Sequence, residues 1–384
     1  MRGFARSEFE ARCARAQGLM AEAGLAALML TTEPEVRYFT GYLTRFWESP
    51  TRPWFLVVPA SGKPIAVIPS IGAALMGETW IDDIRCWSAP DLADDGVSLL
   101  AETLREVVPV GAKVGLPDGH ETQLRMPLAD LERLRQAIGP REICGDSGLI
   151  RAIRMVKSAA EVDKIETACA IAGRSYARVP EIAAEGVPLE RIFRQFQILC
   201  LEEGADWVPY LAGGAGQGGY ADVISPATPT PLAAGDVLML DTGLVHDGYF
   251  CDYDRNWSVS TPSKEAADAH GQLIDATDAG AEAARPGATA SDVFHAMNKV
   301  LKAGGEGTDA GRLGHGLGMS LTEWPSLIAT DHTVLEPGMV LTLEPGIATK
   351  GADGRIVVHE ENILITEGAP RFLSPRYGRE MIVL

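Results

Sequence analysis

The chain has 384 residues, 46% of them apolar and 22% charged, which is an ordinary globular composition on a chain long enough for two domains. No apolar run approaches the roughly 20 residues that span a bilayer. The formal net charge of −18 argues against partners such as nucleic acid or an anionic membrane surface. Six scattered cysteines without a C-x-x-C motif exclude zinc-finger chemistry. A charged N-terminus without an apolar signal region predicts a cytoplasmic protein.

Strands and helices alternate over roughly residues 1–150, which predicts an α/β domain. Ser7 and Glu10 have the spacing of a capping box, so a helix is expected from there to about Ala23. Short apolar runs predict strands at residues 25–30, 54–59, 64–68 and 113–116, and helical patterns lie at 72–76, 97–108 and 122–138.

A different pattern begins near Arg154. Residues 158–185 and 188–203 have the pattern of long amphipathic helices, and 265–284 that of a further helix. Glycine- and proline-rich segments frame the remaining strands, which is typical of antiparallel hairpins in an α+β domain. We therefore predict two domains, residues 1–153 and 154–384.

An internal repeat in the second domain places an acid at the end of two similar apolar runs. Residues 235–243 (GDVLMLDTG) match 338–346 (GMVLTLEPG) at both glycines, the valine and two leucines. Both copies carry an acid at the same place, Asp241 and Glu344. A carboxylate beside a core strand is costly unless it is paired or bound to metal. Two ordinary buried strands would explain the apolar residues but not the shared acid.

The segment 237–260 has the pattern of a hairpin whose turn is at His246–Gly248. With His246 and Asp247 at the centre of the turn, Asp241 lies across from Asp252; with Asp247 and Gly248 there, it lies across from Asp254. Opposed carboxylates repel, and a divalent cation is the simplest remedy, with Mn²⁺, Mg²⁺, Ca²⁺ and Fe²⁺ suited to oxygen ligands. The alternative is that one acid points to solvent.

Two further residues complete a set of metal ligands. His315 is flanked by glycines, which allow the backbone to approach a ligand closely. Glu360 lies inside an apolar strand pattern that could form a hairpin with residues 338–344 and so lie beside Glu344. One histidine and four carboxylates could share two cations, the arrangement of a hydrolytic two-metal centre.

These residues, in this order, resemble the creatinase/prolidase/methionine-aminopeptidase family of "pita-bread" metallopeptidases. The resemblance is strong over residues 154–384 and weaker over 1–150, which would be the creatinase-like N-terminal α/β domain. It implies a pita-bread α+β catalytic domain. The matching blocks are Asp241–Gly243, Cys251–Arg255, Gly314–Gly318, Thr342–Gly346 and Glu360–Thr366.

The resemblance also implies a role for each ligand. Asp241 would chelate one metal, Asp252 and Glu360 would bridge both, and His315 and Glu344 would hold the other. Glu344 would also be the catalytic proton shuttle. The cofactors would be two divalent ions, with Mn²⁺ expected first and Fe²⁺, Co²⁺ or Zn²⁺ as alternatives.

Two departures from the family concern the substrate. Proline-specific peptidases carry one histidine before the first metal strand and another, in a His-Glu pair, after the ligand histidine; here these positions hold Ile224 and Thr322, the latter followed by Glu323. Thr322 and Glu323 therefore become candidate catalytic residues. We expect a metallohydrolase of a C–N bond that is similar to Xaa-Pro peptidases. The alternatives are a creatinase-like, ectoine-hydrolase-like or dimethylsulfoniopropionate-lyase-like enzyme for a small methylated or cyclic compound, and a metal-free binding protein.

Arginines and aromatic residues around a loop at residues 42–54 could contact the substrate, a small molecule or short peptide. In the family this loop reaches the active site of a partner subunit, so a homodimer is expected. Arg45 or Arg52 could bind a carboxylate, and the aromatic residues could instead form a dimer contact. The candidate pocket residues are Trp47, Trp54, Tyr210, Tyr220 and Trp324.

Overall fold

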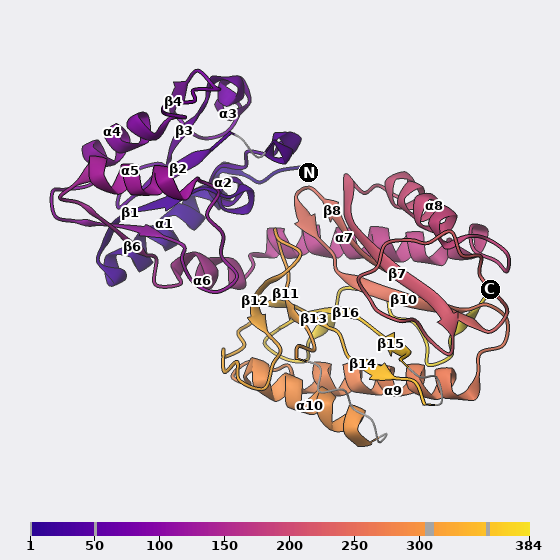
Figure 1. Ribbon diagram of the computed structural model, residues 1–384. Coiled ribbons are helices and arrows are strands. Elements are labelled where there is room, and N and C mark those ends of the chain that lie inside the picture. Colours follow the sequence, from indigo (N-terminus) through magenta and orange to yellow (C-terminus); the bar gives the residue numbers. More distant parts are fainter. Residues whose placement is uncertain (1, 50–51, 304–310, 351–353) are drawn as a thin grey trace. The chain divides into compact units, whose positions relative to one another are not determined.

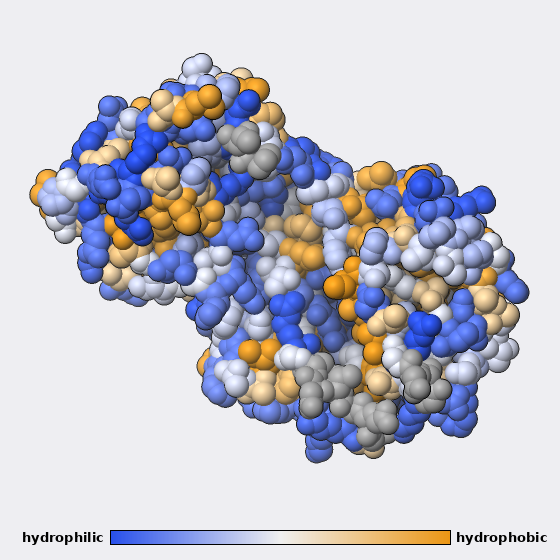
Figure 2. Space-filling model, in the orientation of Figure 1, coloured by the Kyte–Doolittle hydropathy of each residue, from blue (hydrophilic) through white to orange (hydrophobic). Residues whose placement is uncertain are grey.

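The computed structural model describes residues 2–49, 52–303, 311–350 and 354–384. The chain forms two compact units, Met1–Arg154 and Met155–Leu384, divided one residue after the predicted boundary (Figure 1). Polar residues cover most of the visible face of each unit, with apolar residues in small separate groups (Figure 2). Within the described ranges, no helix is both long enough and apolar enough to cross a membrane.

The first unit is an α/β unit built on one six-stranded sheet of order β4-β3-β2-β1-β5-β6. β1 and β2 are antiparallel, as are β2 and β3, and the other neighbours are parallel. α4 and α5 cover one face, where their leucines pack on alternate residues of β1, β2 and β3. The strands are β1 (Leu25–Leu30), β2 (Phe55–Pro59), β3 (Ile65–Pro69), β4 (Asp83–Trp87), β5 (Lys113–Leu116) and β6 (Glu142–Gly145), and the helices are α1 (Arg6–Ala23), α2 (Glu33–Thr40), α3 (Ala73–Gly77), α4 (Val97–Val107), α5 (Leu128–Ile138) and α6 (Leu149–Met155).

Two predictions for this unit were wrong in detail. Ala5 is the N-cap of α1 and Ser7 lies inside the helix, so the predicted capping box does not form. A capping box occurs instead at the start of α2, where the Thr32 amide donates to Glu35 at 3.2 Å. α5 begins at Leu128 rather than at residue 122, directly after Pro127, whose fixed φ suits a helix start. α2, α6, β4 and β6 were not predicted.

The second unit places strands between two pairs of helices (Figure 1). One sheet has the order β18-β10-β8-β7, with β9 paired to β8, and another has the order β12-β11-β13-β16-β17. β14 and β15 form a separate hairpin. The strands are β7 (Trp207–Gln217), β8 (Asp236–His246), β9 (Tyr249–Phe250), β10 (Tyr253–Ser258), β11 (His315–Gly316), β12 (Glu323–Ser326), β13 (Val340–Leu343), β14 (Gly346–Ala348), β15 (Ile356–Val358), β16 (Glu361–Leu364), β17 (Arg371–Phe372) and β18 (Ile382–Val383), and the helices are α7 (Ala159–Ala177), α8 (Leu189–Glu202), α9 (Lys264–Ala283) and α10 (Ala290–Ala303).

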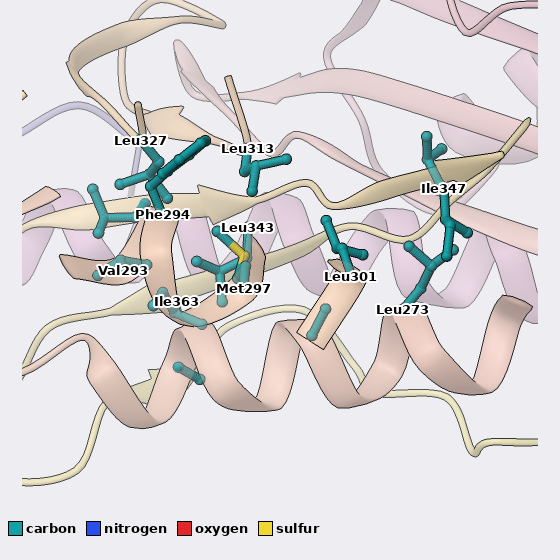
Figure 3. Close-up of a cluster of buried hydrophobic side chains, with 14 of the residues drawn as sticks. Leu273, Val293, Phe294, Met297, Leu301, Leu313, Leu327, Leu343, Ile347 and Ile363 are labelled. Atoms are coloured by element: carbon teal, nitrogen blue, oxygen red, sulfur yellow. The ribbon is translucent and has the colours of Figure 1, made fainter. Parts of the chain in front are cut away.

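Apolar side chains fill the space between helices and strands in this unit. Leu273 of α9 and Met297 of α10 pack with Leu343 and Ile363 from the β13–β16 pair (Figure 3). On the other side, Tyr176 of α7 stacks on an aromatic ring of α8 and packs against two aromatic rings of β10. Each sheet therefore has a helix-covered apolar face.

The helix expected over residues 158–185 is shorter than predicted. α7 ends at Ala177, and only a single 3₁₀ turn follows at Val179–Glu181. Pro180 lacks the amide hydrogen that a continuing α-helix needs, and its ring clashes with the preceding turn. α10 was not predicted.

Candidate metal centre

The β8–β10 hairpin has the second of the two predicted registers. Asp241 lies directly across from Asp254, and the turn is centred on Asp247 and Gly248. Asp252 lies in the break between β9 and β10. There its backbone amide donates to Asn362 Oδ1 at 3.1 Å and its carbonyl accepts from Asn362 Nδ2. This departure from the regular ladder lets Asp252 as well as Asp254 approach Asp241.

A second hairpin supplies two more acids. β13 and β16 are antiparallel, and Leu343 pairs with Glu361. The ligand candidates lie one residue beyond this pair, Glu344 after β13 and Glu360 before β16. Glu360 is therefore in the short link between β15 and β16, not inside a strand as predicted. Continuing the register places Glu360 opposite Glu344, as the sequence pattern suggested.

The glycines around His315 allow two strands to approach closely. A Cβ at Gly314 would lie 2.2 Å from the Thr342 carbonyl oxygen, and one at Gly316 would lie 2.3 Å from the Trp324 carbonyl oxygen. The close neighbour is thus backbone rather than a ligand. The His315 amide donates to Thr342 Oγ1 at 2.9 Å, which fixes the histidine beside Glu344.

Two groups of side chains have the geometry of metal sites. Asp252, His315 and Glu344 form one group, and Asp241, Asp252 and Glu360 form the other. Within each group one ligand atom per residue lies within 4.8 Å of the others. Asp252 belongs to both groups, so its carboxylate lies where a bridging ligand of two cations would lie.

The protonation of His315 suits a ligand. Its Nδ1 lies 2.8 Å from the Gly316 carbonyl oxygen, which can only accept a hydrogen bond, so Nδ1 carries the proton and donates. Nε2 faces Glu344 Oε1 at 2.9 Å and Asp252 Oδ2 at 3.4 Å. In the neutral tautomer with the proton on Nδ1, the Nε2 lone pair points into the carboxylate group, as metal-binding histidines require.

Burial and mutual repulsion set the pKa values of the acids. Burial, followed by the charge of Glu344, raises the pKa of Asp241 from 3.8 to about 7. Burial and the neighbouring acid Asp241 raise the pKa of both Asp252 and Glu360 well above the usual range. Burial would also raise the pKa of Glu344, but His315 outweighs it and lowers the value to about 2. Conversely, burial acts to lower the pKa of His315, and Glu344 outweighs it, so the net shift is upward.

One buried atom indicates that the group fits cations. Asp241 is 5% exposed, and its Oδ1 has no hydrogen-bond partner among the described residues. A buried carboxylate oxygen without a partner is rare in proteins because desolvation is costly. Divalent cations would satisfy this oxygen and remove the repulsion that raises the pKa of these acids.

The chain belongs to metallopeptidase family M24, which matches residues 163–367, and residues 12–156 match the creatinase/prolidase N-terminal domain. It is therefore a metallohydrolase with a creatinase-like N-terminal domain and a pita-bread catalytic domain. Family M24 depends on two divalent metal ions, in agreement with the two carboxylate-rich groups.

Several named proteins are similar along most of the chain. The probable dipeptidase PepE of Mycobacterium tuberculosis (strain ATCC 25618 / H37Rv) is 30% identical over 370 residues, covering 95% of this chain and 94% of that protein. The Xaa-Pro dipeptidase of Pyrococcus horikoshii is 29% identical over 260 residues, which is 67% of this chain and 73% of that protein. The crystal structure of the dipeptidase PepE from Mycobacterium ulcerans has a TM-score of 0.84 at 30% identity and covers 99% of both chains.

The residues expected to contact substrate are distributed over both units. Tyr210 of β7 lies beside the metal-ligand group, since a hydrogen bond between its side chain and Asp241 contributes to the pKa shifts of both. Arg45, Trp47, Arg52 and Trp54 belong to the first unit, in which exposed Arg45 pairs with Glu48 at 3.2 Å. Positions 50 and 51 of that loop lie outside the described residues.

Two of the residues that were predicted to line the substrate pocket are instead buried in the core. Tyr220 is 1% exposed, its ring is part of the core, and its hydroxyl contacts Asn256 Oδ1 and the Val358 amide. Trp54 is also 1% exposed and packs between Tyr42 and Trp47. Both side chains are held in the interior of their own units, because large aromatic residues in apolar sequence surroundings bury most of their surface.

Glu323 is held by contacts that fix a loop. Its Oε2 lies 3.2 Å from Lys157 Nζ, and its Oε1 accepts the amides of Met319 and Ser320. Thr322, just before β12, is half-buried, as is Trp324, whose indole donates to a threonine hydroxyl at 2.8 Å. We interpret Glu323 as a positioning residue for the segment that carries Thr322, rather than as a catalytic acid.

The sequence interpretation missed Asn362 and Arg312. Asn362 clamps the backbone of Asp252, and the signal for it is a polar residue inside the apolar run after Glu360. Arg312 lies three residues before His315, and its charge acts on the metal-ligand group. Nothing in the pattern around Arg312 distinguishes it from any other exposed arginine.

Proposed function

We propose that this chain hydrolyses dipeptides or short peptides, with Xaa-Pro substrates first. The cations would be held by Asp241, Asp252, His315, Glu344 and Glu360, with Mn²⁺ expected and Fe²⁺, Co²⁺ or Zn²⁺ as alternatives. The observation that supports this most strongly is the place of Asp252 in both ligand groups. A bridging carboxylate is the feature that distinguishes a two-metal centre from two unrelated acidic clusters.

When bound, the two cations supply Lewis-acid activation of water and of the scissile carbonyl. As a metal ligand Glu344 would be ionised, because a carboxylate binds a divalent cation in its deprotonated form. Its carboxylate can therefore accept a proton from the attacking water and pass it to the leaving nitrogen. Tyr210 lies beside Asp241 and can orient the Asp241 carboxylate. The contacts of Glu323 hold the segment before β12 in place.

The two histidines of proline-specific relatives are replaced, so substrate contacts must differ. Ile224 is 77% exposed and offers no polar group. Thr322 can donate a hydrogen bond but carries no charge. We propose that Thr322 contacts the substrate carbonyl. We also propose that the protein is a homodimer in which Arg45 and Arg52 reach the active site of the partner subunit. Its proposed location is the cytoplasm.

The test is hydrolysis of Xaa-Pro dipeptides and Xaa-Pro-Xaa tripeptides by the full chain loaded with Mn²⁺. Cleavage that is lost in Asp252→Ala and retained in Asp82→Ala, an exposed acid of the first unit, would support the proposal. Asp82 is a suitable control because it is exposed and pairs with Lys63, far in sequence from any ligand candidate.

Absence of cleavage despite two bound cations would contradict the peptidase proposal. The replacement of both histidines would then favour a hydrolase or lyase for a small methylated or cyclic compound. The same protein would next be assayed with creatine, ectoine and dimethylsulfoniopropionate. Absence of metal binding would instead favour a binding protein.

A further inference from the structure

A buried arginine of β10 is connected to the metal centre. Arg255 is 1% exposed, and its guanidinium carbon lies 4.5 Å from the centre of the Tyr253 ring and 4.9 Å from that of the Tyr377 ring. Its Nη2 pairs at 3.1 Å with Glu361, which is fully buried. Two aromatic rings and an ion pair therefore hold this guanidinium in one position.

Arg255 also donates to backbone carbonyls, one of which belongs to a ligand candidate. Its Nη1 donates to the Asp254 carbonyl at 2.7 Å and to the Glu360 carbonyl at 2.8 Å. Its Nη2 donates in addition to the Pro375 carbonyl at 2.6 Å. Glu360 lies in the link between β15 and β16, outside both strands. The arginine thus supplies a hydrogen bond to Glu360 at a place where regular strand pairing ends.

Stability alone is a poor explanation for this arrangement. Taking two charges out of water costs about as much as their attraction returns, so a buried ion pair such as Arg255–Glu361 is weak evidence for stability. A guanidinium does, however, present several donors in a fixed planar fork. That geometry suits a residue that orients a backbone segment.

The contact with the arginine reaches only one of the two ligand groups. Glu360 belongs to the group that it forms with Asp241 and Asp252, and not to the group of His315. His315 has a separate support, because its amide donates to Thr342 Oγ1 at 2.9 Å. Each group is therefore held by a different hydrogen bond to the backbone of one of its members.

We propose that Arg255 is a positioning residue for Glu360, and that it supports one of the two cations selectively. That cation is the one that Asp241, Asp252 and Glu360 would hold. By binding the Glu360 carbonyl, the guanidinium fixes the backbone from which the Glu360 carboxylate extends into its ligand group. The cation of the His315 group does not depend on this contact. This inference rests on the proposed two-metal centre.

The experiment measures Mn²⁺ binding to the full chain and to two variants by calorimetric titration. Arg255→Lys keeps the positive charge beside Glu361 but not the planar fork of donors. Thr342→Val is the mirror variant, because it removes the hydroxyl that accepts the His315 amide. Each variant should lose affinity about 10- to 100-fold at one Mn²⁺ site, the range for residues that orient a ligand, and keep the affinity of the other.

Pulsed electron paramagnetic resonance identifies the site that each variant retains. With one equivalent of Mn²⁺, Arg255→Lys should show nitrogen coupling from His315, whereas Thr342→Val should bind Mn²⁺ in the all-carboxylate group and show none. A general structural role of Arg255 would lower both affinities together. Equal weakening of the two sites in Arg255→Lys, no weakening, or loss of the nitrogen coupling would overturn the inference.

Glu361→Gln separates the ion pair from the contact with Glu360. It removes the charge but leaves the donors of Arg255 facing the carbonyls of Glu360 and Pro375, so both cations should remain. Loss of the same cation as in Arg255→Lys would show that the ion pair holds the site, and would overturn the inference.

A crystal structure of the Mn²⁺-loaded wild type decides the matter if Arg255→Lys does not fold. The Glu360 carbonyl should still accept from Arg255 while the Glu360 carboxylate binds metal. A carbonyl that turns away from the guanidinium in the loaded protein would overturn the inference.

None of these measurements requires hydrolysis. A wild type that binds two Mn²⁺ ions but cleaves no peptide would contradict the proposed function and leave this inference intact. A wild type that binds fewer than two Mn²⁺ ions would contradict both.

Discussion

The sheets of the two units bury side chains of opposite chemistry. In the first unit, β1, β2 and β3 bury apolar residues such as Leu28 and Phe55, both 0% exposed. In the second unit, the β8–β10 hairpin buries Asp241, Asp252 and Asp254, which are 0–5% exposed. Apolar burial stabilises a sheet by itself, whereas buried carboxylates require partners. The first unit therefore depends on packing, whereas the buried carboxylates of the catalytic unit also need charged or hydrogen-bonding partners, a need that cations would meet.

The largest effect should come from removing the shared carboxylate. Asp252→Asn keeps the shape of the side chain but loses a charge in both ligand groups. Hydrolysis should fall by at least about 10³-fold, since cations contribute several kcal/mol to the transition state. Bound Mn²⁺ per chain, measured by elemental analysis, should fall with it.

The melting temperature of the metal-free protein gives a second, independent test of this variant. Without cations, Asp252→Asn should melt at a higher temperature than the wild type, because it removes repulsion with Asp241. A lower melting temperature of the metal-free variant would contradict the view that these acids are destabilising without metal. The matched variant Asp82→Asn should change neither property.

The first unit should respond to loss of apolar volume and not to metal. Phe55→Ala removes a fully buried ring from the core between β1, β2 and α4 and should cost about 3–5 kcal/mol of the free energy of unfolding. Chemical denaturation with and without Mn²⁺ would measure this loss. Leu92→Ala, at a fully exposed leucine, should cost less than about 0.5 kcal/mol. If Mn²⁺ restored the stability that Phe55→Ala loses, the first unit would also depend on metal, and the contrast between the two units would be wrong.

The effect of pH on stability should have opposite signs with and without metal. The pKa of Asp241 is raised to about 7 in the fold, so the folded state holds a proton that the unfolded chain releases near 3.8. Raising the pH from about 4 to 7 therefore removes stability from the metal-free protein. Cations compete with this proton, so the apparent affinity for Mn²⁺ should fall about tenfold per unit below pH 7.

Melting curves at pH 5 and pH 8, with and without Mn²⁺, would test both signs. Asp252 and Glu360, whose pKa values are also raised, should add to the effect. In Asp241→Asn the dependence should become shallower. A metal-free protein that gains stability from pH 5 to 8 would contradict the assignment of protons to this group.

Local patterns in the sequence predicted much of the fold, and contacts between distant residues explain the errors. β1 begins and ends at the predicted residues because its apolar run is bounded by turn residues. The residues that form the two carboxylate-rich groups were also predicted from the sequence, since acids inside apolar runs are unusual wherever they occur. The register of Asp241 remained open between two partners, because the turn alone allows both.

The position of Asp252 could not be predicted from its neighbours in the chain. It leaves the β8–β10 ladder because Asn362, 110 residues away, replaces the missing backbone partners. Tyr220 was misassigned for a similar reason: its hydroxyl bonds to Val358, which is 138 residues away. Hydrogen bonds of this separation leave no periodic signal in the sequence.

Asn362 should therefore give the smallest but most specific effect on the metal centre. Its side chain accepts the Asp252 amide at 3.1 Å and donates to the Asp252 carbonyl, yet it is not itself in either ligand group. Asn362→Ala should weaken Mn²⁺ binding about 10- to 100-fold, the range for residues that orient a ligand. Asn362→Asp keeps the acceptor but loses the donor. It should therefore weaken Mn²⁺ binding less than Asn362→Ala does if the contact with the Asp252 amide dominates. Calorimetric titration with Mn²⁺ would measure both variants, with Asn298→Ala of α10 as the control. If Asn362→Ala bound Mn²⁺ as tightly as the wild type, the turn between β8 and β10 would be enough to hold Asp252. Contacts between distant residues would then not be needed to form the metal centre.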